Sequence, residues 1–241
     1  MPVPSRSFAV DRRAVWILTL AVTVALLLLP VRTSLIRLGL IVGGVCTVGA
    51  GFWMLGLTGR VVLLVALATV VGLFSLPARP LEAASLRAAY LDGVANRSSA
   101  YYVWGGETHL GIDCSGLVRL PLVSALAREG LRRLDGGALR AAAHLWWTDA
   151  SAAELGRGFG GRARLVGEFA DARQIDERVR PGDFAITADG THAMVYTADQ
   201  TWTEADPRVG RVLVLDAGED VSAWLVVPVR VMRWTVLEGH S

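Results

Sequence analysis

The sequence has no lysine, only two cysteines and only four histidines among its 241 residues. All 24 basic residues are therefore arginine, which we interpret as a coding bias rather than as chemistry. Two cysteines without a C-x-x-C pair exclude a disulfide framework. No cluster of His, Cys and Asp has the spacing of metal ligands, so the sequence predicts neither a metal site nor a cofactor.

Acidic residues are nearly missing from residues 1–76, which contain only Asp11 against six arginines. Residues 77–241 carry 18 arginines and 21 acidic residues, and this slightly acidic balance without a basic patch argues against nucleic-acid binding. Hydrophobic residues make up 53% of the chain, too many for an ordinary soluble domain of this size. The sequence predicts a basic membrane segment, 1–76, and a globular domain, 77–241, joined at the Pro-Ala-Arg-Pro linker 77–80.

Three uncharged apolar stretches lie in the first segment: Ala14–Val31, Leu38–Leu57 and Val61–Leu76. A bilayer core requires about 20 apolar residues, with a range of roughly 17–25. We therefore expect a retained transmembrane anchor of about three helices. The alternative for the first stretch is a signal peptide, but no small-x-small cleavage site follows it.

Small residues recur every fourth position in the second stretch, at Gly39, Gly43, Thr47 and Gly51. This spacing lines one helix face with small side chains and favours packing within the chain over a dimer contact. The arginines that flank the stretches favour a cytoplasmic N-terminus under the positive-inside rule. Three crossings would then place residues 77–241 outside the cytoplasm.

The globular domain changes character along its length. Helical spacing predicts helices at 81–96, 114–129 and 138–147, and short β runs divided by turn signals follow at 183–187, 192–197, 201–205, 211–216 and 224–237. Helices followed by antiparallel strands predict an α+β domain.

Cys114 stands at the predicted start of a helix, directly after Asp113. If Asp113 is the N-cap, the thiol lies in the first turn, where the helix dipole lowers its pKa and free backbone N–H groups could form an oxyanion hole. The alternative is a small buried cysteine with a packing role.

A thiolate nucleophile needs a base. Among the histidines, His109 lies in the loop before Cys114, His144 in an Ala/Trp-rich helix and His240 at the chain end. His192 begins a strand after an Asp-Gly turn. A histidine at a strand start facing a cysteine at a helix start is the papain-type geometry.

The segments "YVWGG…DCSGLV" and "PGDFAI…GTHAMVYTAD" resemble the NlpC/p60 family of cell-wall cysteine peptidases, over about Leu81 to Val236. The matching positions of the cysteine box are Tyr102, Trp104, Gly105, Gly106, Asp113, Cys114, Ser115 and Gly116. The resemblance implies a papain-like α+β fold with Cys114 as nucleophile, His192 as base and Tyr102 near the oxyanion. Trp104, Asp113 and Ser115 are candidate substrate contacts, although capping also accounts for the last two.

Two features depart from the family pattern. The third catalytic position, 12 residues beyond the base, is Glu204 instead of the usual His. A carboxylate can orient an imidazole through its Nδ1–H and stabilise imidazolium; Asp206 is the alternative orienter, and both acids could also be solvated turn residues. The gap between Cys114 and His192 is long, which predicts an insertion at about 130–178 that walls a groove or packs over the core through Trp146, Trp147 and Phe159.

The resemblance implies a membrane-anchored enzyme that cleaves peptidoglycan stem peptides at a γ-D-glutamyl bond to a diamino acid. One alternative is a thiol hydrolase or acyltransferase acting on lipid or small-molecule amides at the bilayer. Another is a catalytically inactive wall-binding module. The expected partners are the peptidoglycan peptide and the lipid bilayer, and the sequence leaves the oligomeric state open.

Overall fold

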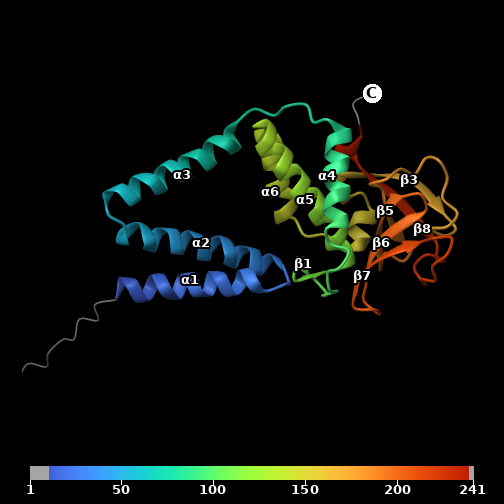
Figure 1. Cartoon of the computed structure of the whole chain (residues 1–241), viewed down its shortest axis with the longest axis horizontal. Coiled ribbons are helices and arrows are strands. Elements are labelled where there is room, and N and C mark those ends of the chain that lie inside the picture. The colour runs from blue at the N-terminus through green and yellow to red at the C-terminus, as the bar shows by residue number, and fades with distance from the viewer. Residues whose placement is uncertain (1–10, 239–241) are drawn as a thin grey trace, which may run out of the picture. The chain divides into compact units, whose positions relative to one another are not determined.

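The computed structural model describes residues 11–238 of the chain (Figure 1). Residues 1–10 and 239–241, with Arg6 and His240, lie outside the described residues. The chain divides into two compact units. The first comprises Met1–Leu29 and Leu35–Val71, and the second comprises Pro30–Ser34 and Gly72–Ser241.

Helices α1 (Arg12–Leu28), α2 (Ser34–Met54) and α3 (Leu57–Ser75) belong largely to the first unit. Among the described residues, α2 and α3 are long and apolar enough to cross a bilayer. The 17 residues of α1 span only about 26 Å at 1.5 Å per residue, short of a hydrocarbon core of roughly 30 Å. The helices are thus compatible with an anchor, and three crossings stay a prediction.

The small-residue face of α2 packs against α1. A β carbon on Gly43 would lie 2.6 Å from the Oγ1 atom of Thr23, and one on Gly51 would lie 3.0 Å from the indole nitrogen of Trp16. The hydroxyls of Thr23 and Thr47 are 3.3 Å apart. Such close approach requires glycine, so the prediction of packing within the chain is confirmed.

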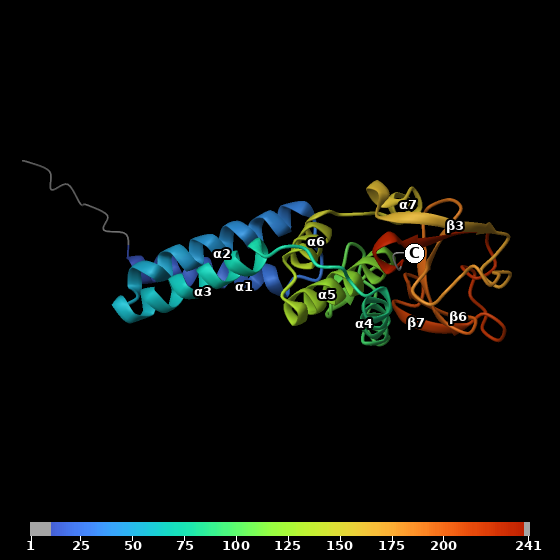
Figure 2. The same ribbon diagram turned by 90° about the horizontal axis from the view of Figure 1, so that it is seen from above.

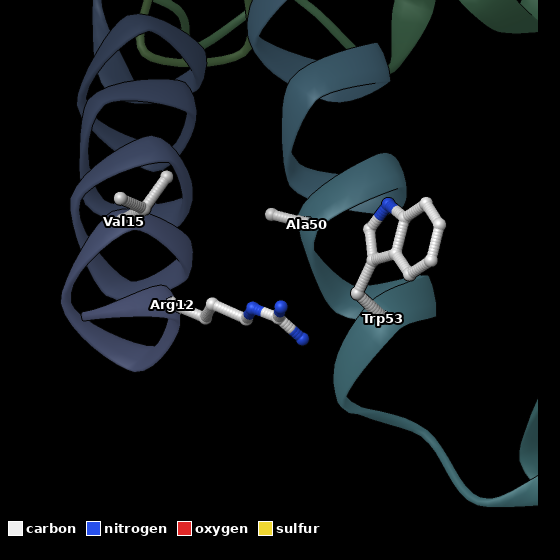
Figure 3. Close-up of a pocket in the computed structure, with 4 residues that line it drawn as sticks. All are labelled: Arg12, Val15, Ala50 and Trp53. Carbon is white, nitrogen blue, oxygen red and sulfur yellow. The ribbon is translucent and has the colours of Figure 1, made fainter. Parts of the chain in front are cut away.

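Farther along the same helix pair, a pocket of about 420 Å³ is lined by Arg12, Val15, Ala50 and Trp53 (Figure 3). Arg12 extends from α1 toward the side of α2 that carries Ala50 and Trp53. None of these four side chains is a nucleophile or a carboxylate, so this pocket supports no catalytic role.

The second unit combines helices with an antiparallel sheet, which confirms the α+β class (Figure 2). Its helices are α4 (Ala83–Ala95), α5 (Cys114–Arg133), α6 (Gly136–Trp147) and α7 (Ala152–Gly156), with single 3-10 turns at Phe159–Gly161 and Thr235–Leu237. The hairpin β1 (Glu107–Thr108) and β2 (Gly111–Ile112) precedes α5. The main sheet has the order β3-β8-β4-β5-β6-β7, formed by β3 (Ala163–Phe169), β4 (Phe184–Thr187), β5 (Ala193–Ala198), β6 (Thr201–Asp206), β7 (Arg211–Asp216) and β8 (Val229–Trp234).

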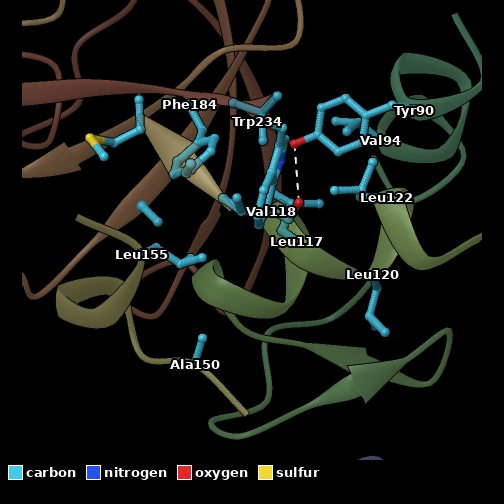
Figure 4. Close-up of a cluster of buried hydrophobic side chains, with 14 of the residues drawn as sticks. Tyr90, Val94, Leu117, Val118, Leu120, Leu122, Ala150, Leu155, Phe184 and Trp234 are labelled. Carbon is cyan, nitrogen blue, oxygen red and sulfur yellow. Dashed lines mark hydrogen bonds between the residues drawn. The ribbon is translucent and has the colours of Figure 1, made fainter. Parts of the chain in front are cut away.

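A hydrophobic core joins α4 and α5 to the sheet (Figure 4). Tyr90 of α4 is fully buried, and its hydroxyl donates to the carbonyl of Val118 in α5 at 3.1 Å. Phe184 and Trp234 pack from the sheet with ring centroids 5.0 Å apart. Because α5 is buried along most of its length, its N-terminus is held firmly against the sheet.

The region 130–178 does more than loop over the core, because it supplies α6, α7 and the strand β3. The sequence did not predict β3, which pairs with β8. Its alternation is interrupted by a register shift between Leu165 and Gly167, which hides the strand signal. The observed strand β8, Val229–Trp234, is shorter than the predicted strand 224–237 and begins only after Pro228. Of the aromatic residues, Phe159 is buried and Trp147 is exposed.

Candidate active site

The N-terminus of α5 is built around Asp113, which caps it as predicted. One carboxylate oxygen of Asp113 accepts from the backbone N–H of Gly116 at 2.6 Å and from the Ser115 hydroxyl at 2.9 Å. The other oxygen accepts from the backbone N–H of Gly105 at 2.9 Å. Capping therefore occupies both Asp113 and Ser115, and it ties the Gly-Gly turn to the helix that begins at Cys114.

Two glycines allow this turn to approach the helix. A β carbon on Gly116 would lie 2.7 Å from the carbonyl oxygen of Gly106, and one on Gly106 would lie 2.6 Å from that of Val103. Any larger residue would push the turn away from the first turn of α5. The glycines of the cysteine box thus serve close backbone packing.

The thiol of Cys114 is buried, with 9% of the residue exposed. Burial raises its pKa to about 12, and the charge of Asp113 adds to that rise. Hydrogen bonds from the backbone N–H groups of Ala193, Ser115 and Cys114 itself act in the opposite direction. The expectation of a lowered pKa at the helix N-terminus is wrong, because desolvation outweighs these donors.

His192 precedes β5 and is fixed by the turn before it. Its backbone N–H donates to the Thr187 hydroxyl at 3.0 Å, and that hydroxyl donates to the Asp189 carboxylate at 2.6 Å. Asp189 also accepts from the N–H and hydroxyl of Thr191. The hydrogen bond from the Thr187 hydroxyl makes the largest contribution to lowering the pKa of Asp189. The Asp-Gly turn therefore locks the backbone from which the imidazole projects.

The imidazole of His192 is paired with Glu204 of β6, both side chains being buried. The Nε2 atom of His192 lies 3.2 Å from one carboxylate oxygen of Glu204. The contact thus uses Nε2, not the Nδ1–H that we expected, and a carboxylate acceptor places the proton on Nε2. Asp206, the alternative orienter, accepts from the backbone N–H of Arg208 instead.

Ser222 and Trp224 complete this arrangement, and the sequence did not single them out. The Ser222 hydroxyl donates to the second oxygen of Glu204 at 3.0 Å. The Trp224 ring stacks on the imidazole of His192 with centroids 4.2 Å apart and planes 16° from parallel. The guanidinium carbon of Arg208 lies 4.8 Å from the centroid of the Trp224 ring. One short loop thus holds both the carboxylate and the imidazole.

The sulfur of Cys114 lies near the backbone of the residue that follows His192. The N–H of Ala193, directly after His192, hydrogen-bonds the thiol. Within residues 11–238, no hydrogen bond joins that thiol to the imidazole itself. Nδ1 of His192 has no hydrogen-bond partner among the described residues.

A pocket of about 280 Å³ opens onto Cys114. Its lining consists of Val31, Arg32, Thr33, Tyr102, Trp104, Gly105, Glu107, Asp113, Cys114, Ser115, Asp149, Ala150, Ser151, Ala152, Gly190 and Thr191. Residues 149–152 come from the predicted insertion, so that region does wall the groove, although not through the aromatic residues we expected. His192 is 1% exposed and is not among these lining residues.

Tyr102 and Trp104 both line this pocket in different ways. Trp104 is 81% exposed and stands at the rim. Tyr102 is partly buried, and burial, followed by the charges of Cys114, Asp113 and Asp206, raises the pKa of its phenol to about 12. A phenol that keeps its proton remains a hydrogen-bond donor near the sulfur.

The remaining histidines lie apart from this arrangement. His109 is exposed before β2, and His144 of α6 contacts Thr148 and Arg162. In the described part of the chain, no group of three or more His, Cys, Asp and Glu side chains could hold a metal ion.

The thiol at the start of α5 thus lies near the backbone N–H of Ala193, directly after the histidine that precedes β5 in the antiparallel sheet. The NlpC/P60 family matches residues 99–222, just over half of the chain. This chain belongs to the NlpC/P60 family, a family of hydrolase and peptidase type. No curated protein matches the sequence.

Several solved structures are similar to this chain at low sequence identity. The peptidoglycan hydrolase RipB of Mycobacterium tuberculosis is 17% identical, with a TM-score of 0.40 over 61% of this chain and 65% of its own. NlpC1 of Trichomonas vaginalis is 16% identical, with a TM-score of 0.42 over 64% of this chain and 46% of its own. A P60 domain from a Mycobacterium avium subspecies paratuberculosis antigen is 16% identical, with a TM-score of 0.43 over 66% of this chain and 99% of its own. The chain thus spans less than two thirds of RipB and about half of NlpC1.

The raised pKa of Cys114 predicts how the free thiol reacts. With a pKa of about 12, the thiolate fraction rises with pH across the whole neutral range. In a Cys46→Ser background, which removes the exposed second cysteine, iodoacetamide should alkylate Cys114 about tenfold faster for each pH unit between 6 and 9. A rate that is constant over this range would show a preformed thiolate and contradict the prediction. The unfolded chain, whose thiol titrates normally, is the control.

Proposed function

We propose that this protein is a membrane-anchored cysteine endopeptidase or amidase that cleaves peptidoglycan stem peptides at a γ-D-glutamyl bond to a diamino acid. Family membership supports cell-wall peptidase activity in general. The observation that carries the specific proposal is the buried His192–Glu204 pair beside the Ala193 N–H that bonds the Cys114 sulfur.

The first half of the reaction forms an acyl-thioester. The S–H proton of Cys114 passes to Nδ1 of His192 as the sulfur attacks the scissile carbonyl carbon. Since the thiol is protonated at rest, this transfer accompanies substrate binding rather than preceding it. Backbone N–H groups at the start of α5 stabilise the tetrahedral oxyanion, with the Tyr102 phenol as a further donor. The C–N bond then breaks as the imidazolium returns the proton to the leaving amine.

The second half releases the acyl group. Nδ1 of His192 takes a proton from water, which attacks the thioester carbonyl. The new tetrahedral intermediate collapses to the free carboxylic acid, which ionises in solvent, and the thiolate takes the proton from the imidazolium. Glu204 stabilises the imidazolium in both halves, because a carboxylate beside a buried cation offsets the loss of its hydration.

The proposal is tested by the products of the full-length protein in detergent micelles. Incubation with a disaccharide-tetrapeptide should release a fragment that ends at the second stem residue, identified by mass spectrometry. The proposed reaction uses only protein side chains and water, so EDTA should leave the rate within twofold. Intact substrate after prolonged incubation, or cleavage at the sugar–peptide junction, would contradict the proposal. An activity that EDTA abolishes would point to a different enzyme in the sample.

A further inference from the structure

The segment Pro30–Ser34 connects α1 to α2 in the sequence, yet it belongs to the compact unit that contains Cys114. The N–H of Arg32 donates to the carbonyl of Gly105 at 3.0 Å, and the N–H of Glu107 donates to the carbonyl of Pro30 at 2.9 Å. Val31 and Gly106 form an antiparallel bridge between these bonds. The segment is thus paired with the chain that leads into the cysteine box.

This pairing reaches the first turn of α5 through one residue. The carbonyl of Gly106 accepts from the N–H of Asp113 at 3.0 Å. The same carbonyl lies against Gly116, where a β carbon would approach it to 2.7 Å. A displacement of Val31 would therefore move Gly106, and Gly106 would move the backbone on both sides of Cys114.

Three consecutive residues of the segment, Val31, Arg32 and Thr33, line the pocket that opens onto Cys114. Residues 149–152, Gly190 and Thr191 also line this pocket. Arg32 is buried, whereas Thr33 is exposed, and both are among the residues that line the pocket. The pocket has no complete wall on this side without the segment.

We propose that residues 31–33 form a substrate-binding wall of the cysteine site, supplied from between two apolar helices, which sets the affinity for the stem peptide. This inference rests on the proposed function and adds to it a binding role for the membrane segment. The segment positions and binds, and it donates no group to bond cleavage. Its variants should therefore change KM more than kcat.

The wall is compatible with the proposed anchor. Hydrogen bonds between residues 30–32 and 105–107 require both stretches to lie on one side of a bilayer. An even number of crossings between them satisfies this requirement, and α2 with α3 supplies two helices long enough to cross. The same requirement holds whether or not α1 also crosses.

The test places a bulky side chain at the opening. In the full-length protein, Thr33→Trp should raise KM for a soluble disaccharide-tetrapeptide at least tenfold and leave kcat within threefold. Alkylation of Cys114 by iodoacetamide, which is far smaller than the substrate, should stay within twofold. Thr33→Ala separates lost contacts from added bulk, and Thr58→Trp is the matched control on an exposed threonine of α3 outside the pocket.

The outcomes distinguish this inference from the proposed function. If the wild type cleaves the tetrapeptide and Thr33→Trp changes KM less than twofold, the proposal that residues 31–33 bind substrate is overturned and the proposed function stands. If the wild type cleaves nothing, binding of the same tetrapeptide to Cys114→Ala replaces KM, and Thr33→Trp should weaken that binding tenfold. A wild type that neither cleaves nor binds the peptide overturns the proposed function and the wall with it.

Discussion

Replacing Cys114 by alanine is expected to lower kcat/KM for stem-peptide cleavage by at least about 10³-fold. The thiol is the nucleophile in the proposed reaction, and without it no acyl-thioester forms. Alanine fits the space of a small buried residue, so the fold should survive, which thermal unfolding checks. Reaction rates are measured by chromatography of released fragments from full-length protein in micelles.

The second cysteine provides the matched control for this experiment. Cys46 lies in α2 and is exposed. Cys46→Ala should keep the rate within twofold, because this residue has no part in the pocket. Equal product release by Cys114→Ala and the wild type would rule out thiol catalysis. Tight peptide binding without turnover in the wild type would instead favour the inactive wall-binding module.

Replacing Glu204 by glutamine is expected to lower kcat about 10²-fold while KM changes less than threefold. The amide has nearly the shape of the carboxylate. Its oxygen can still accept from Nε2 of His192, while its NH2 group can donate to the Ser222 hydroxyl. It cannot neutralise an imidazolium in a buried site, so both proton transfers become less favourable. Steady-state kinetics with the soluble tetrapeptide separates the two constants.

Asp206 is the control for Glu204, because it lies two residues along the same strand and is also buried. Asp206→Asn should lower kcat less than fivefold, since its carboxylate accepts from Arg208 and not from His192. The reverse order of effects would assign the orienting role to Asp206. A loss in KM rather than in kcat for Glu204→Gln would indicate a substrate contact instead.

The sequence predicted the parts of the site that depend on local chemistry. Asp113 before an apolar run is a capping signal that needs no tertiary information, and the spacing of Glu204 from His192 follows from the short hairpin between β5 and β6. The capping role of Asp113 was therefore predicted from the residues alone, whereas Glu204 was located through the family resemblance, as the position 12 residues beyond His192. Their catalytic roles stay proposals until the variants above are measured.

Other features depend on contacts that no local pattern carries. Ser222 and Trp224 lie in an irregular loop, and only the folded chain brings them to Glu204 and His192. The pKa of Cys114 was misjudged because the dipole of a helix can be read from sequence, whereas the depth of burial cannot. The backbone hydrogen bonds Arg32–Gly105 and Glu107–Pro30 join positions 73 and 77 residues apart, with two apolar helices between them, so no local pattern predicts them.

The backbone pairing of Pro30–Ser34 bears on how this protein can be produced. A recombinant fragment that starts at the Pro77 linker would be easy to purify, but it would expose the Gly105 carbonyl and the Glu107 amide to water. Inhibitors selected against that fragment would be fitted to an opening that the intact protein closes. Detergent-solubilised full-length protein is therefore the preparation in which potency and selectivity have meaning.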